Sequence, residues 1–127
     1  MSFVSQIFIM AGINDLSHGV APEELGDNMD KIVKTIDNFL PDTEIYIQSV
    51  LPVIDSKVTL DEICEANMEL ESVAQENGCS YVDLYGQFMD ESGDVISRYL
   101  SADGVHLNGA GYAVWVEAID KYMMSEK

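Results

Sequence analysis

The sequence is poor in basic residues. It has 6 lysines and arginines against 23 aspartates and glutamates among 127 residues, which gives a formal net charge of −17. A field of this sign repels nucleic-acid phosphates and anionic lipid headgroups, so we expect no nucleic-acid partner. The acidity has two interpretations, a solvated surface that favours solubility or an attraction for cationic partners, and the first is the commoner.

Cysteine is also scarce, and long apolar runs are missing. Cys64 and Cys79 lie outside any CxxC or zinc-type spacing, which excludes a disulfide framework. We expect both to be buried free thiols and the location to be the cytoplasm, although a shortened N-terminus would also remove an export signal. No apolar run approaches the length of a membrane span, and residues 1–6 lack the basic start of a signal peptide.

The chain has enough apolar residues, 47%, to build one globular domain over residues 1–127. The uninterrupted apolar run at its start is typical of a strand buried on both faces of a parallel sheet. A capping box at Thr59 and a glycine stop at Gly78 bound one of the helices. The predicted order is a strand at 6–11, a helix at 22–40, a strand at 44–51, a helix at 60–77, a strand at 80–84 and a helix at 108–124. This alternation predicts an α/β fold.

The first strand is followed by Gly12-Ile13-Asn14-Asp15, which we expect to form a polar turn. Gly12 permits a tight exit from the strand, and the side-chain amide of Asn14 then lies just beyond the strand's carboxyl end. An amide N–H in that place can stabilise a developing oxyanion. Alternatively, Asn14 and Asp15 are turn formers that bond their own backbone.

The second polar cluster, Asp103-Gly104-Val105-His106-Leu107-Asn108, precedes the last helix. A carboxylate near an imidazole holds one tautomer and stabilises the imidazolium, which is the arrangement of a general base. The alternative is structural, with Asp103 and Asn108 bonded to loop amides and His106 packed in passing. One histidine and one carboxylate fall short of a zinc ligand set, so we expect no metal. His18 is expected to be an exposed loop residue.

These motifs, in this order, resemble those of the SGNH (GDSL-type) hydrolases, especially the compact acetylhydrolase-like esterases, over about residues 6–122. The resemblance rests on GIND at 12–15, SVLPV at 49–53, YVDL at 81–84 and DGVHLN at 103–108. It implies a three-layer α/β/α, flavodoxin-like fold and hydrolysis of small esters, including acylated sugars, without a cofactor. It further implies that Asn14 and Gly12 belong to the oxyanion hole, that His106 is the general base and that Asp103 orients it.

The family's serine nucleophile is not found. In the resembling proteins it lies in a Gly-Asp-Ser block that ends an earlier strand, and no such block precedes residue 6 here. Gly26-Asp27-Asn28 has asparagine in place of serine and lies in a helical pattern. The other candidates lack a strained strand-to-helix turn or lie at the wrong end of a strand; they are Ser5, Ser17, Ser49 and Ser101.

If residues 1–127 are the whole chain, it corresponds to the C-terminal part of the family fold and lacks its first strands. We then expect weak or no activity, because a catalytic triad acts as a unit. The first strand would also present an unpaired apolar edge, which favours a homodimer. The alternative to an esterase is a non-catalytic remnant that acts as a self-associating or binding module.

Overall fold

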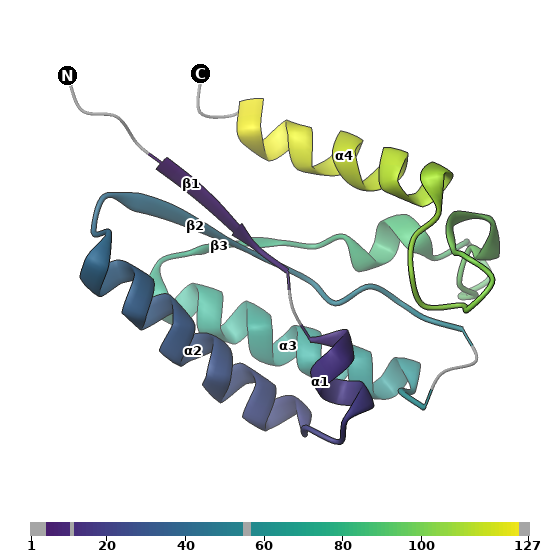
Figure 1. The fold of residues 1–127 in the computed structure, drawn as a ribbon, viewed down its shortest axis with the longest axis horizontal. Helices are drawn as coiled ribbons and strands as arrows, with labels where there is room; N and C mark the ends of the chain where they lie inside the picture. Colours follow the sequence, from purple (N-terminus) through teal and green to yellow (C-terminus); the bar gives the residue numbers. More distant parts are fainter. Residues whose placement is uncertain (1–4, 11, 55–56, 125–127) are drawn as a thin grey trace.

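The fold is an α/β arrangement built on a three-stranded parallel sheet. A computed structural model describes residues 5–10, 12–54 and 57–124. The sheet order is β1-β2-β3, with Ile7 opposite Ile45 and Ile47 opposite Tyr81. Helices α2 and α3 cover one face and α4 covers the other (Figure 1). The elements are β1 (Ser5–Ile9), α1 (Ile13–Ser17), α2 (Pro22–Phe39), β2 (Thr43–Gln48), α3 (Leu60–Asn77), β3 (Ser80–Val82), η1 (Tyr85–Phe88), η2 (Ser97–Tyr99) and α4 (Gly109–Met124). The predicted α/β fold with a parallel sheet is confirmed.

All three strands are shorter than predicted. β1 ends at Ile9, and Ala11, the last residue of the predicted strand, lies outside the described residues. β2 ends at Gln48 because the amide side chain of Asn67 takes both backbone groups of Val50, at 2.7 and 3.1 Å. A side chain therefore replaces the neighbouring strand as hydrogen-bond partner at the end of β2.

The prediction of a turn over residues 12–15 is wrong. Gly12 caps a short helix, α1, at φ +126°, and its carbonyl accepts the N–H of Leu16 at 2.8 Å. A Cβ at Gly12 would lie 2.7 Å from Cγ2 of Val50, so the close approach to the segment after β2 requires glycine. Asn14 and Asp15 therefore stand in the first turn of a helix, exposed to solvent.

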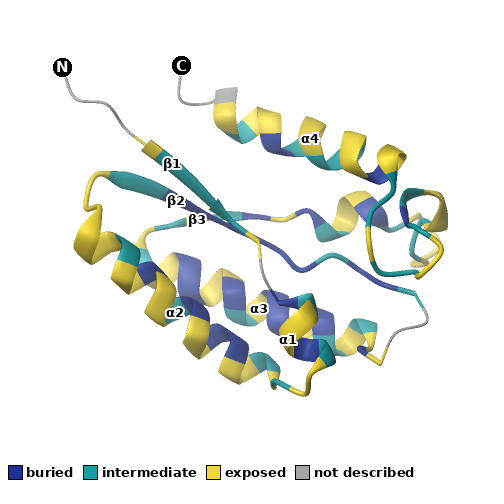
Figure 2. Ribbon diagram, in the orientation of Figure 1, coloured by how far each residue is buried: buried dark blue, intermediate teal, exposed yellow. Residues whose placement is uncertain are grey.

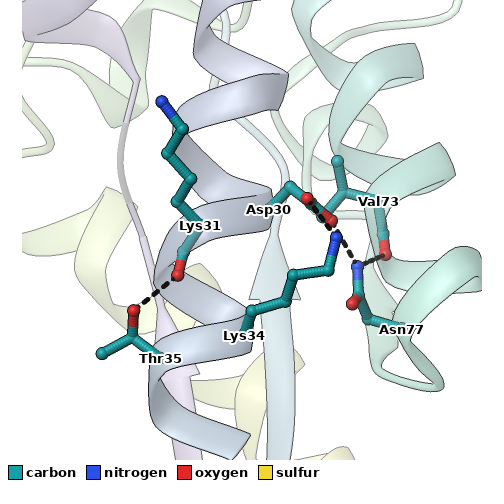
Figure 3. A network of polar contacts seen from close by, with 6 residues as sticks. All are labelled: Asp30, Lys31, Lys34, Thr35, Val73 and Asn77. Atoms are coloured by element: carbon teal, nitrogen blue, oxygen red, sulfur yellow. Dashed lines mark hydrogen bonds and ion pairs between the residues drawn. The ribbon is translucent and has the colours of Figure 1, made fainter. Parts of the chain in front are cut away.

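The two long helices on one face begin where the sequence predicts and end within one residue of the predicted position. Pro22 opens α2, the side chains of Thr59 and Glu62 form a reciprocal capping box on α3, and Gly78 adopts the left-handed conformation at φ +70°. Figure 3 shows the polar contact between them. The side-chain amide of Asn77 donates to Asp30 at 2.8 Å, and Asp30 pairs with Lys34 at 2.6 Å.

The core has two parts, one on each face of the sheet (Figure 2). The larger lies under α2 and α3 and contains Ile45, Ile47 and Val33. The smaller lies under α4 and contains Tyr46 and Ile119. Successive side chains of β2 point to opposite faces of the sheet, as in any strand. Ile45 and Ile47 therefore belong to the larger part and Tyr46 to the smaller.

The expectation that both thiols are buried is wrong. Cys64 is exposed and only Cys79 is half-buried, because Cys64 lies on the solvent side of α3, next to the buried Ile63. The apolar residues of α4 also do not form one buried face. Ile119 is buried, whereas Tyr112, Val116 and Met123 are exposed.

Candidate active site

The loop that carries Asp103 and His106 is closed on itself and tied to the segment after β2. The N–H of Ser101 donates to the carbonyl of His106 at 2.7 Å, and Leu100 bridges to Leu107. At the tip, Gly104 has φ +73° and its carbonyl accepts the N–H of Ile54 at 2.7 Å. A Cβ on Gly104 would collide with the carbonyl oxygen of Ile54. Only a glycine at position 104 therefore lets the loop come this close to the backbone of Ile54.

The structure joins Asp103 and His106 through two kinds of hydrogen bond. Oδ2 of Asp103 lies 2.6 Å from Nδ1 of His106. Oδ1 accepts the backbone N–H groups of Val105 and His106 at 2.9 and 3.0 Å. An ionised carboxylate only accepts, so Nδ1 carries the hydrogen and Nε2 is the basic nitrogen of the neutral ring. The side chain of His106 is 74% exposed and that of Asp103 is 49% exposed.

These contacts set the ionisation of Asp103. The hydrogen bond from the His106 ring, with the backbone N–H groups of His106 and Val105, lowers the pKa of Asp103 from 3.8 to about 2. The carboxylate is therefore ionised throughout the pH range in which a histidine titrates. Because the pKa is lowered in the folded chain, this contribution to stability is present above pH 3.8 and is lost as pH falls towards 2.

We expect a carbon-13 NMR titration to find the carboxyl pKa of Asp103 well below 3.8. In His106→Ala the pKa should rise towards 3.8 and stop short of it, because the backbone N–H groups still donate to Oδ1. An Asp103 pKa that is unchanged in His106→Ala would contradict the contact.

Asp103 and His106 form an Asp–His dyad, and the loop that carries them is the dyad loop. Asn108 fixes the position of this loop relative to α4. Its side-chain oxygen accepts the N–H of Gly111 at 2.9 Å, as an N-cap does. Its amide group donates to the carbonyls of Arg98 and Leu100 at 2.8 and 3.0 Å. One side chain therefore ties the start of α4 to the segment that precedes Asp103.

Gly12 and Asn14 lie at the start of α1, and no hydrogen bond within the described part of the chain joins Asn14 to the dyad. Gly12 lies against Val50 and Gly104 lies against Ile54. Four residues span at most about 14 Å, so the start of α1 and the loop that carries Gly104 adjoin one short segment after β2. In Figure 1, α1 and the loop before α4 both lie beyond the carboxyl ends of the strands. The family resemblance implies that Asn14 and His106 serve one active site, and this stays a prediction.

The remaining polar candidates have structural partners. Nδ1 of the exposed His18 donates to the carbonyl of Asn14 at 2.6 Å. Ser49 is fully buried, and its Oγ accepts the N–H groups of Leu84 and Tyr85 at 2.9 and 3.0 Å. Ser17 donates to the carbonyl of Ile13 at 2.7 Å. Within residues 5–10, 12–54 and 57–124, no hydrogen bond links a serine hydroxyl or a thiol to the ring of His106.

The dyad stands on an open surface. Two hollows of about 460 and 430 Å³ lie on the helical layer, one lined by Lys34, Asp37, Asn38 and Pro41 and the other by Ala21, Pro22, Glu23, Glu65, Met68 and Glu69. Neither includes Asp103 or His106. Among the residues that the structure describes, no three His, Cys, Asp or Glu side chains are placed to hold a metal ion. None of the helices described is both long and apolar enough to cross a bilayer.

The dyad loop lies within the part of the sequence that matches a known protein family. Residues 5–114 match the GDSL-like Lipase/Acylhydrolase family. The chain belongs to this family. It is therefore a member of the SGNH hydrolase family, as its motifs suggested, and the matched range includes Gly12, Asn14, Asp103 and His106.

Solved structures share the fold of this SGNH family member. A candidate platelet activating factor from Streptococcus pneumonia is 24% identical with a TM-score of 0.84, covering 93% of this chain and 59% of its own. A candidate acylhydrolase from Bacteroides fragilis is 20% identical with a TM-score of 0.81, covering 96% and 62%. A GDSL-like lipase from Bacteroides thetaiotaomicron is 20% identical with a TM-score of 0.80, covering 97% and 63%. The chain thus spans about three-fifths of the length of these structures. Among curated proteins, no sequence matches it significantly.

Sequence reasoning missed three residues that shape this region. Asn67 ends β2, Ser49 bonds the chain after β3, and Ile54 holds the tip of the dyad loop. A buried-looking asparagine between the apolar Ala66 and Leu70 was a signal for the first of these. Nothing in the local sequence around Ile54 indicates its partner.

Proposed function

We propose that this domain, residues 1–127, carries the acid–base part of an ester-hydrolysing site. The observation that carries the proposal is the 2.6 Å contact between Asp103 Oδ2 and His106 Nδ1 on a loop of a GDSL-like acylhydrolase family member. Asp103 holds the ring so that Nε2 faces outward as the base. The contact also stabilises the imidazolium that forms when Nε2 takes a proton.

In the proposed reaction, Nε2 of His106 takes the proton of a nucleophilic hydroxyl as that oxygen attacks the ester carbonyl. The same nitrogen then gives the proton to the leaving alcohol, and water repeats the sequence on the acyl intermediate. Asn14, on α1 beside the glycine cap Gly12, would donate its side-chain amide to the oxyanion. Small esters, including acylated sugars, are the substrates proposed, and the cytoplasm is the proposed location because Cys64 and Cys79 are both free.

We propose that residues 1–127 alone act weakly or not at all on such esters. No serine among the residues described is hydrogen-bonded to His106. Without a nucleophile, the dyad can act only as a base. Members of a catalytic triad act as a unit, so the remaining groups give far less acceleration than a complete triad does.

The test is hydrolysis of p-nitrophenyl acetate by the purified chain. We expect a slow rate that depends on His106, because a positioned base contributes a factor of about 100 or more. His106→Ala should therefore lower the rate by about 100-fold. His18→Ala is the matched control, since His18 is also exposed and also bonded through Nδ1, but to a backbone carbonyl.

A rate that His106→Ala leaves intact would exclude the dyad as the base. No measurable rate in the unaltered chain would favour the second candidate, a non-catalytic module that self-associates as a homodimer. The observation that favours this module is the edge of β1, which has no partner strand among the described residues.

A further inference from the structure

Asn108 binds three consecutive carbonyl groups of the segment that leads into the dyad loop. Its side-chain amide donates to the carbonyls of Arg98 and Leu100, at 2.8 and 3.0 Å. Its backbone N–H donates to the carbonyl of the residue between them, Tyr99, at 3.0 Å. An asparagine has only these three N–H hydrogens to donate. All of them are therefore directed at residues 98–100.

The hydrogen bonds of Asn108 exceed what a helix cap needs. A cap requires only an acceptor, and the side-chain oxygen of Asn108 serves the N–H of Gly111 in this way, at 2.9 Å. A Cβ on Gly111 would collide with the carbonyl oxygen of Tyr99, so the segment and the start of α4 are in close contact without further help. The side-chain amide group of Asn108 plays no part in capping. It binds the chain that leads to Asp103 instead.

The two ends of the dyad loop meet at a backbone hydrogen bond of 2.7 Å, from the N–H of Ser101 to the carbonyl of His106. Only residues 102–105 lie between these ends, and Asp103 is one of them. The side chains of Asp103 and His106 are exposed, so hydrogen bonds rather than packing have to hold them. The 2.6 Å contact between them therefore depends on how firmly the two ends of the loop are joined. Asn108 joins them from two residues beyond His106.

We infer that Asn108 is a positioning residue for the base of the proposed ester-hydrolysing site. Its side-chain amide fixes the start of the dyad loop relative to the end of the loop. This keeps the Asp103 carboxylate against Nδ1 of His106 and leaves Nε2 facing outward. Asn108 thus acts through the dyad and not on the substrate. The inference rests on the proposed function, in which Nε2 of His106 takes the proton.

Asn108→Ser separates the positioning role from capping. Serine is among the best N-cap residues, so its hydroxyl oxygen can still accept the N–H of Gly111. Its single hydroxyl hydrogen cannot replace the two hydrogens of the amide. The substitution changes no charge, so it has no direct electrostatic effect on Asp103. Asn108→Ala removes the cap together with both donors.

We expect Asn108→Ser and Asn108→Ala to lower the rate of p-nitrophenyl acetate hydrolysis alike. The loss should be about tenfold, because misplacing a catalytic group by about 1 Å can cost up to about 100-fold. In a carbon-13 NMR titration the pKa of Asp103 should rise towards 3.8 in both variants, because the His106 ring and the backbone N–H groups that lower it are held less firmly. Asn108→Ala should unfold at a lower temperature than Asn108→Ser, since it also loses the cap.

Asn77→Ser is the matched control (Figure 3). Asn77 is also half-buried, and its side-chain amide also donates to two oxygens, those of Asp30 and Val73, at 2.8 and 2.9 Å. It ends α3 close to the start of β3, at the opposite end of the sheet from the dyad loop (Figure 1). Lys34 and then Asn77 lower the pKa of Asp30, so Asn77→Ser should raise that pKa. The pKa of Asp103 and the ester rate should stay unchanged.

Three results would count against these proposals. A rate and an Asp103 pKa that change in Asn108→Ala but not in Asn108→Ser would overturn the positioning role and leave Asn108 as a helix cap. Equal changes in Asn77→Ser would overturn it too, because they would trace to a general loosening of the fold. If the unaltered chain has no measurable rate, the proposed function fails, and the Asp103 titration alone then supports or overturns the role of Asn108.

Discussion

Gly104→Ala is expected to lower the free energy of unfolding by about 3 kcal/mol. Two costs add at this position. A φ of +73° costs an L-residue roughly 1–2 kcal/mol, and forcing a methyl group into packed structure costs roughly 1–3 kcal/mol more. The collision is with the backbone oxygen of Ile54, which cannot rotate away as a side chain can. The loop must move, and the bond from Ile54 N–H to the Gly104 carbonyl is lost.

Urea unfolding measures the loss in Gly104→Ala. Two other glycines separate the conformational cost from the packing cost in the same experiment. Gly93 has φ +84° with no atom near its would-be Cβ, so Gly93→Ala should cost only the conformational part, about 1–2 kcal/mol. Gly109, at the start of α4, has neither a positive φ nor a close neighbour, and alanine there should be neutral or stabilising. Equal losses in Gly104→Ala and Gly93→Ala would contradict the close approach to Ile54.

Ser49→Ala is expected to cost a similar amount, about 3 kcal/mol, for a different reason. The Ser49 hydroxyl is fully buried and accepts the backbone N–H groups of Leu84 and Tyr85. Alanine leaves two donors without a partner, and each buried unsatisfied group costs about 1–3 kcal/mol. Water cannot replace the oxygen easily in a packed site.

The control is Ser72→Ala, at an exposed position of α3, which should change the free energy of unfolding by less than about 0.5 kcal/mol. Thermal unfolding monitored by circular dichroism measures both variants. A Ser49→Ala chain as stable as the Ser72→Ala chain would show that the hydroxyl does not anchor the segment after β3. The same burial explains why Ser49, although it follows a strand's carboxyl end, is unavailable as a nucleophile.

The ends of the helices could be predicted because their causes are local. Pro22, the box of Thr59 and Glu62, and Gly78 act on backbone groups within a few residues, so the chain's order alone fixes them. The ends of the strands could not be predicted in this way. Asn67 acts on Val50 across 17 residues and Ser49 acts on Leu84 across 35. Only the folded chain decides which distant side chain is near.

The same division runs through the candidate site. The spacing of Asp103 and His106 is three residues in a glycine-containing loop, so their contact follows from local geometry once the loop closes. The tie to Ile54 and the exposure of Val116 are tertiary, because each depends on which element lies alongside. The sequence by itself determined the order of the strands and long helices, the caps of α2 and α3, the charge and the pairing of the dyad. The tertiary structure decided where the strands stop, which apolar side chains stay in water and what holds the dyad loop, since these depend on contacts between residues far apart in the chain.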